Sequence, residues 1–268
     1  MVQILALLIL TAFPSAGSQD LPRVAQDLDH SSWDSLLKQY VSAEFRVDYR
    51  KWKNGGTREL DTYLSRVAGR WPPAMTPAAR KTALINAYNA LTIRWVLENY
   101  PLKSIWQTSH PFTGQRHVLD GNKVSLDEIE SGLRKMGDPR VHSALVCASR
   151  SCPPLRGEAY KADRLENQLD DNTRAWLAHS DLNAFDSVHG IARVSMIFKW
   201  YSQDFEQNGN TVRTFLARHA PAGQAAFLGG SNAKIEYKTY AWGLNDTSAL
   251  GSDYSEIRFL WDYFRNRF

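Results

Sequence analysis

Apolar residues recur at helical spacing over much of the chain. In residues 31–41 they form one stripe that starts at Trp33, and residues 58–69 show a second, shorter stripe that ends at Gly69. Side chains three and four positions apart share one face of a helix, which is the face that a core can bury. The pattern therefore predicts one helix in each segment, the second stopping at its glycine.

The strongest helical pattern covers residues 76–101. Thr76 is a suitable N-cap, Pro77 suits the first turn, and Pro101 ends the helix. Asn86 and Asn89 fall on or beside its apolar face. A buried amide costs stability unless its hydrogen bonds are met. These residues are therefore either satisfied core amides, which the helix alone favours, or amides directed at a site.

The few strand signals are short and separated by helices. Asp120-Gly121 indicates a hairpin turn, and Ser125 with Glu128 forms a capping box before a helix that carries Glu130 beside its inward stripe. Strands are also predicted at 141–147, 190–194 and 233–246, and helices at 162–179 and after Ser195. Because no strict β-α alternation appears, the chain is expected to be α+β: a mainly helical single domain around a small, largely antiparallel sheet.

The C-terminal segment, residues 252–268, contains an amphipathic pattern. Its stripe consists of Ile257, Leu260, Trp261, Phe264 and Phe268. We expect this stripe to dock a helix on the domain, because large apolar side chains rarely stay exposed. Contact with a membrane surface or a partner is the less favoured alternative, despite the arginines nearby.

The N-terminus changes the expected location of the protein. Residues 2–13 are almost wholly apolar and are followed by Pro14 and small residues. This pattern is typical of a secretory signal peptide over residues 1–18, cleaved near Gly17 or Ser18. A retained anchor is the alternative, because the segment before the apolar run lacks Lys and Arg. We expect residues 19–251 to form the domain of a periplasmic or extracellular protein.

Composition excludes some functions. The chain has 268 residues and a formal net charge of +4, with its basic residues scattered and not clustered. A dispersed excess of this size is usual for a solvated surface, so no nucleic-acid partner is expected. No phosphate-binding glycine loop appears, and no cofactor is predicted.

The two cysteines, Cys147 and Cys152, are the main candidates for chemistry. In an exported protein such a pair usually forms a disulfide, provided the Cα atoms come within about 7 Å. Alternatively, Cys147 is a nucleophile with His142 as its base, although an ideal strand would place these residues on opposite faces. His189 is the second candidate base. A zinc site is disfavoured because only Cys147, Cys152 and His142 cluster, and their spacing matches no familiar zinc pattern.

Five ordered motifs resemble those of the domain-of-unknown-function 547 family, here as an exported, bacterial-type member. They are INAYNALTIRWVLENYP, LDEIESGLR, DPRVHSALVCASRSCPPL, SMIFKWYSQDF and YAWGLND, and the resemblance extends over roughly residues 40–246. Ser131 departs from the family, which often has His after the Glu. The resemblance implies a shared fold. Because the motifs concentrate costly polar groups, it also indicates one pocket made by Asn86, Asn89, Glu130, His142 and Cys147.

Two functions are compatible with these residues. In a thiol-dependent hydrolase or acyl transferase, Cys147 attacks an amide or ester, His142 moves the proton, and Glu130 orients His142. Asn86 or Asn89 then donates to the oxyanion. In the alternative, the protein is a ligand- or envelope-binding module with a Cys147–Cys152 disulfide. A redox role is weaker because the spacing is not C-x-x-C. The substrate would be a small molecule, a peptide or an envelope component, with membrane contact only through residues 257–268.

Overall fold

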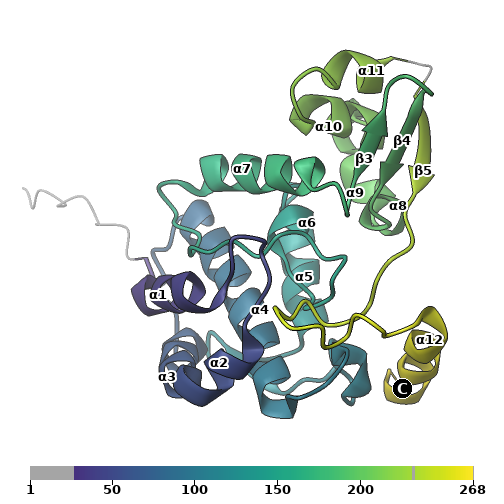
Figure 1. Cartoon of the computed structure of the whole chain (residues 1–268). Coiled ribbons are helices and arrows are strands. Elements are labelled where there is room, and N and C mark those ends of the chain that lie inside the picture. The colour runs from purple at the N-terminus through teal and green to yellow at the C-terminus, as the bar shows by residue number, and fades with distance from the viewer. Residues whose placement is uncertain (1–26, 231–232, 268) are drawn as a thin grey trace, which may run out of the picture.

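A computed structural model of the chain describes residues 27–230 and 233–267 (Figure 1). The predicted signal peptide lies outside these residues. Within the described part of the chain, no helix is long and apolar enough to cross a membrane.

The first half of the described chain is a helical body. Its helices are α1 (Ser31–Tyr40), α2 (Tyr49–Gly55), α3 (Thr57–Ala68), α4 (Pro77–Asn99) and α5 (Leu126–Arg134). The short elements η1 (Ile105–Gln107), β1 (His117–Leu119) and β2 (Asn122–Val124) lie between α4 and α5. Helix α4 contacts α2, α3 and α5, and most of its residues are buried. This helix is therefore the centre around which the body is packed.

Local signals in the sequence place these elements correctly. The Thr76 hydroxyl accepts the Ala79 N–H, so α4 begins at the predicted cap. Ser125 and Glu128 form the expected capping box, and Asp120-Gly121 joins the antiparallel strands β1 and β2. These predictions are confirmed because each depends on residues only a few positions apart.

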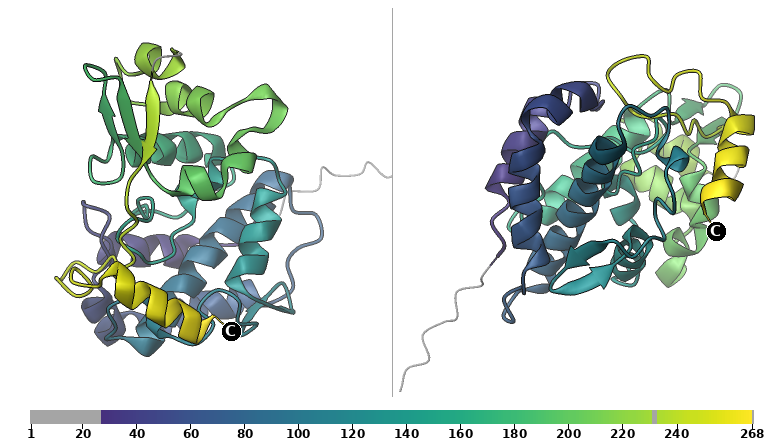
Figure 2. Two further views of the ribbon diagram at one scale, coloured as in Figure 1. Left: turned by 90° about the vertical axis from the view of Figure 1, so that its right-hand side faces the viewer. Right: turned by 90° about the horizontal axis from the view of Figure 1, so that it is seen from below.

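The second half contains the larger sheet. Its elements are α7 (Leu165–Ala178), β3 (Ala184–Asp186), β4 (Ile191–Val194), α8 (Ile197–Trp200), α9 (Ser202–Phe205), η2 (Gln207–Gly209), α10 (Val212–His219), α11 (Ala225–Gly229) and β5 (Lys234–Tyr237). The strand order is β3-β4-β5, with the first pair antiparallel and the second parallel. Figure 2 shows this sheet at one end of the molecule and the terminal helix α12 (Glu256–Asn266) beside the helical body. The α+β class with a helical majority is confirmed.

Two predicted strands are wrong or too long. Residues 141–147 begin with a short helix, α6 (Val141–Ala144), because Asp138 and Pro139 start a turn and Asp138 accepts the Arg140 N–H. The strand predicted over 233–246 stops at Tyr237. The rest of that segment leaves the sheet and hydrogen-bonds to residues 148–151.

Buried apolar side chains form two clusters. The first cluster includes Trp33, Trp52 and Leu97 of the helical body, and the second includes Trp176, Phe198 and Phe215 around the sheet. Cys147 and Trp242 are partly buried and pack against both clusters. We call this boundary the seam. The cysteine segment therefore lies where the two cores meet.

Helix α12 (Glu256–Asn266) packs through a different face from the one expected. Ile257, Trp261 and Phe264 are exposed, with 82%, 66% and 67% of their surface accessible. Phe259 and Tyr263 instead contact the body: the Phe259 ring stacks on Trp242 at 4.2 Å, and the Tyr263 ring lies 5.0 Å from that of Trp106. The expectation of the docking face is wrong because this helix carries aromatic residues on two faces, which periodicity alone cannot rank.

Candidate functional site

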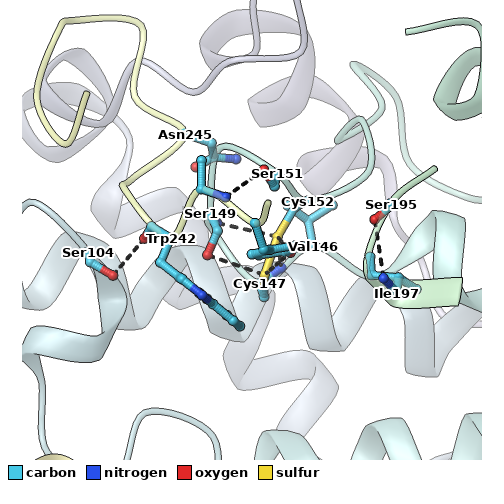
Figure 3. The surroundings of a disulfide bond; sticks show 12 residues. Ser104, Val146, Cys147, Ser149, Ser151, Cys152, Ser195, Ile197, Trp242 and Asn245 are labelled. Carbon is cyan, nitrogen blue, oxygen red and sulfur yellow. Dashed lines mark hydrogen bonds between the residues drawn. A yellow bond between two sulfur atoms is a disulfide. The ribbon is translucent and has the colours of Figure 1, made fainter. Parts of the chain in front are cut away.

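Cys147 and Cys152 form a disulfide at the seam (Figure 3). Their Cα atoms are 6.2 Å apart, within the range that a disulfide requires. Three backbone hydrogen bonds join residues 148–151 to residues 241–245. Two segments about ninety residues apart in sequence therefore hold the turn between the cysteines. Of the alternatives that the sequence left open, the structure has the disulfide.

The turn directs polar hydrogens at the sulfur of Cys152. The Cys147 N–H lies 3.1 Å from this sulfur and the Ser149 N–H 3.3 Å. Ala148 between them has a φ of +65°, a left-handed conformation that costs a residue with a Cβ about 1–2 kcal/mol. Left-handed residues in such turns let nearby N–H groups converge on one point. The Tyr240 hydroxyl also lies 3.3 Å from the Cys147 sulfur and 3.4 Å from the Cys152 sulfur.

The disulfide forms part of the wall of a cavity of about 960 Å³. Both clusters contribute to its lining, so the cavity follows the seam. Its aromatic side chains include Tyr88, Trp106, Trp200, Tyr201, Tyr240 and Trp242. Its ionisable side chains include Glu130, Arg134 and His142. An apolar cavity of this size with a few polar groups is the usual form of a small-molecule site.

His142 is held by Asp204, not by the expected Glu130. The His142 Nε2 lies 2.7 Å from Asp204 Oδ2, and Arg134 donates to both oxygens of the same carboxylate at 2.6 and 3.2 Å. The hydrogen bond with His142, together with those from Arg134, holds the pKa of Asp204 well below its usual range. The imidazole also packs on the Tyr201 ring at 4.4 Å. The ring orientation of His142 is therefore fixed.

Glu130 enters the cavity from α5 with no ion-pair partner within residues 27–230 and 233–267. Burial raises its pKa, while the Tyr201 hydroxyl and the neighbouring His142 act in the opposite direction. Burial, and after it the Glu130 charge, raises the pKa values of Tyr88, Tyr201 and Tyr240. The Glu130 carboxyl group shares the cavity lining with these three phenol rings.

Asn86 and Asn89 do not line the cavity. The side chain of Asn86 both donates to and accepts from the backbone of Tyr160, at 2.9 and 3.0 Å. Asn89 donates to the Ala144 carbonyl at 2.8 Å and accepts the Val146 N–H at 2.9 Å. Both side chains are almost fully buried. Asn89 thus anchors the segment immediately before Cys147, and the structure brings together only Glu130, His142 and Cys147 of the five predicted residues.

The other sequence candidates lie elsewhere. His189 is exposed and pairs with Asp186 at 2.7 Å, and it is absent from the cavity lining. In the described ranges, no group of three or more His, Cys, Asp or Glu side chains is placed to hold a metal ion.

Sequence reasoning missed the roles of Asp204, Tyr201 and Tyr240. All three stand in the quoted motifs SMIFKWYSQDF and YAWGLND, so the motifs contained a signal. Their distance in sequence from His142 and Cys147 concealed the contacts, because only the docking of the second cluster onto the first creates them.

Part of the chain matches the model of one protein family. No curated protein and no solved structure matches the chain. Residues 72–177, which include Glu130, His142 and both cysteines, match the model of the family described as "Protein of unknown function, DUF547", and this match supports the family that the sequence motifs indicate.

Proposed function

We propose that the protein is a binding module for a small organic ligand with a flat apolar part and a cationic group, which enters the cavity at the seam. The observation that carries this proposal is the Glu130 carboxyl group, which lies among aromatic rings without a cationic partner in the described chain. Cations bind well over aromatic faces, and a carboxylate in a partly dry site adds a charged hydrogen-bond acceptor.

The charges around the cavity favour a cation over an anion. Arg134 is occupied by the Asp204 carboxylate through two hydrogen bonds. The Lys238 ammonium donates to the Ser180 carbonyl at 2.9 Å. The Arg267 guanidinium donates to the Tyr263 hydroxyl. Each of these positive groups therefore already has a partner, whereas Glu130 has no ion-pair partner in the described chain. A bound cation would also favour the ionised form of Glu130, opposing the effect of burial on its pKa.

Binding of a minimal probe tests this proposal. Phenyltrimethylammonium is expected to bind more tightly than tert-butylbenzene, its neutral isostere, in an NMR titration. Glu130→Gln should weaken binding of the ammonium probe about tenfold or more, equivalent to about 1.4 kcal/mol, with a smaller effect on the neutral probe.

Glu256→Gln is the matched control, because it removes the same charge from an exposed residue of the cavity lining. Its effect should be smaller, since charges in water are screened. Equal binding of the two probes, or equal effects of the two variants, would contradict the proposal.

A thiol-dependent hydrolase or acyl transferase is the second candidate. It is favoured by one observation: Cys147 lines the same cavity as a histidine that a carboxylate orients. In this candidate the disulfide must first be reduced, Cys147 attacks a carbonyl carbon, and His142 moves the proton. Asp204 replaces Glu130 as the orienting group. The amide N–H groups of Asn86 and Asn89 are engaged with backbone carbonyls, so neither is assigned an oxyanion role here.

Reactivity of the reduced protein distinguishes this candidate. Iodoacetamide should label Cys147 faster than Cys152 at neutral pH, and His142→Ala should slow that labelling. Cys147→Ser should keep the fold and abolish any hydrolysis of p-nitrophenyl acetate. Equal labelling of both thiols with no effect of His142→Ala would exclude the candidate.

We also propose that the protein is exported. The apolar run at residues 2–13, followed by small residues, supports this, and a disulfide persists in an oxidising compartment. The mature chain is expected to begin near Ser18 or Gln19. N-terminal sequencing of secreted material that starts at Met1 would contradict cleavage and favour an anchor.

A further inference from the structure

We propose that the Cys147–Cys152 disulfide exchanges with thiols that enter the cavity, so that it accepts two electrons and is more than a structural crosslink. Nothing in this inference depends on the ammonium-binding function. It rests on three properties of the disulfide: the accessibility of one sulfur, the hydrogen bonds to the other, and the small structural need for the bond.

One cysteine of the pair is more open to attack than the other. Both line the cavity, but Cys147 is partly exposed whereas Cys152 is only 5% exposed. In thiol–disulfide exchange the attacked sulfur forms the new bond and the other sulfur leaves as a thiolate. The accessible sulfur here is that of Cys147, which makes Cys152 the leaving group.

The site is built to stabilise a thiolate on Cys152. The N–H groups of Cys147 and Ser149 point at this sulfur, at 3.1 and 3.3 Å, and Ala148 adopts its unfavourable left-handed conformation between them. Burial and the Glu130 charge raise the pKa of Tyr240, so its hydroxyl stays protonated and can donate to the same sulfur at 3.4 Å. Hydrogen bonds to an ionised acceptor are about twice as strong as neutral ones, so these donors favour the reduced state.

The disulfide contributes little to the stability of the fold. It joins residues five apart, and so small a ring restrains the unfolded chain only weakly. The backbone of residues 148–151 is already bonded to residues 241–245, and Asn89 holds the preceding segment. A crosslink selected for stability would be expected to close a longer loop.

The exchange proceeds in two balanced steps. A thiolate RS⁻ attacks the Cys147 sulfur, the Cys147–Cys152 bond breaks, and Cys152 leaves as a thiolate, giving the mixed disulfide RS–SCys147. A second thiolate attacks the R sulfur, forming RSSR and releasing Cys147 as a thiolate. Two thiols are oxidised and the protein disulfide is reduced, and the protons lost by the thiols are available to the two cysteines. A dithiol supplies both thiolates from one molecule.

Titration of the full-length oxidised protein with dithiothreitol tests the proposal. Samples at graded ratios of reduced to oxidised dithiothreitol, without denaturant, are quenched in acid and alkylated, and their masses are measured. The disulfide should become reduced while near-UV circular dichroism stays native. Tyr240→Phe should lower the equilibrium constant for reduction about two- to tenfold, the effect of one hydrogen bond.

Tyr237→Phe is the matched control, because Tyr237 lines the same cavity but has no contact with either sulfur among the hydrogen bonds of the described chain. It should leave the equilibrium constant unchanged. In addition, oxidised glutathione should form a mixed disulfide with Cys147 in Cys152→Ala, and leave Cys152 unmodified in Cys147→Ala.

Reduction that occurs only after denaturant unfolds the protein would overturn the proposal, as would equal effects of the two tyrosine variants. If a cysteine variant fails to fold, the titrations of the wild type, Tyr240→Phe and Tyr237→Phe decide the matter alone.

Discussion

Asn86 and Asn89 on α4 differ from Glu130 on α5 in how their polar atoms are satisfied. The two amides are buried, and each exchanges two hydrogen bonds with backbone groups. Glu130 faces a cavity, lacks an ion partner in the described chain, and has a pKa that burial raises. All three belong to the motifs that the sequence singled out.

The difference separates two uses of costly polar residues. A buried group with all its hydrogen bonds made specifies packing, and its loss leaves its backbone partners unpaired. A carboxyl group that faces a cavity without an ion-pair partner is available to a cationic ligand. Residue type and position in a motif are the same for both uses, so the hydrogen bonds decide which applies.

Removing an amide whose hydrogen bonds are all made should lower the free energy of unfolding more than any other change considered. Asn89→Ala leaves the Ala144 carbonyl and the Val146 N–H buried without partners, and we expect it to lower the free energy of unfolding by about 3 kcal/mol. Asn99→Ala, at the exposed end of the same helix, should cost less than about 0.5 kcal/mol. Urea denaturation measures both. Similar losses of stability in the two variants would show that Asn89 does not specify packing through its buried hydrogen bonds.

Asp204→Asn should have the next largest effect. We expect it to lower the free energy of unfolding by about 2 kcal/mol, because it weakens the hydrogen bonds to Arg134 and His142. The pKa of Asp204 is lower in the folded state than its ordinary value of 3.8. In the wild type, the ionised Asp204 therefore contributes fully to the stability of the folded state above pH 3.8, and this contribution is lost as the pH falls further. Asp204→Asn should show a weaker loss of stability over that acid range. An identical pH profile would show that the carboxylate is not held as described.

The two faces of α12 extend the comparison to apolar groups. Phe259→Ala removes a ring that stacks on Trp242 and is expected to cost about 1.5 kcal/mol, less than a fully buried phenylalanine. Trp261→Ala removes a larger but exposed side chain and should cost less than about 0.5 kcal/mol. Thermal unfolding compares them, and the reverse order would mean that the helix docks through its predicted stripe.

Glu130→Gln should have the smallest effect on stability, and of the opposite sign. Because the pKa of Glu130 is raised above its ordinary value of 4.5, the folded state holds this proton more tightly than the unfolded state. Stability therefore falls as the pH rises through and above 4.5. The variant removes this loss and should be slightly more stable than the wild type at neutral pH, although it binds the cationic probe more weakly. A destabilised variant would assign Glu130 to packing, with Asn86 and Asn89.

Much of the local structure was predictable because it depends on neighbouring residues. The Thr76 cap, the Ser125–Glu128 capping box and the Asp120-Gly121 turn each involve residues within a few positions. The strand predicted at residues 141–147 failed because an apolar run of that length fits a strand or a buried helical turn equally well. The docking face of α12 failed for a similar reason, since two aromatic stripes compete on one short helix.

The sequence by itself determined the α+β class, the order of most elements and the small set of polar residues from which a site had to be built. It also placed His142, Cys147 and Glu130 among the candidates. Only the tertiary structure decided that Asp204 orients His142, that Tyr240 contacts both sulfurs, and that the two asparagines bind backbone groups. These contacts join residues from about 55 to more than 90 positions apart. Periodicity and capping describe interactions within one element. Contacts of this kind arise only when elements distant in sequence pack together, within the first cluster for the two asparagines and across the seam for Asp204 and Tyr240.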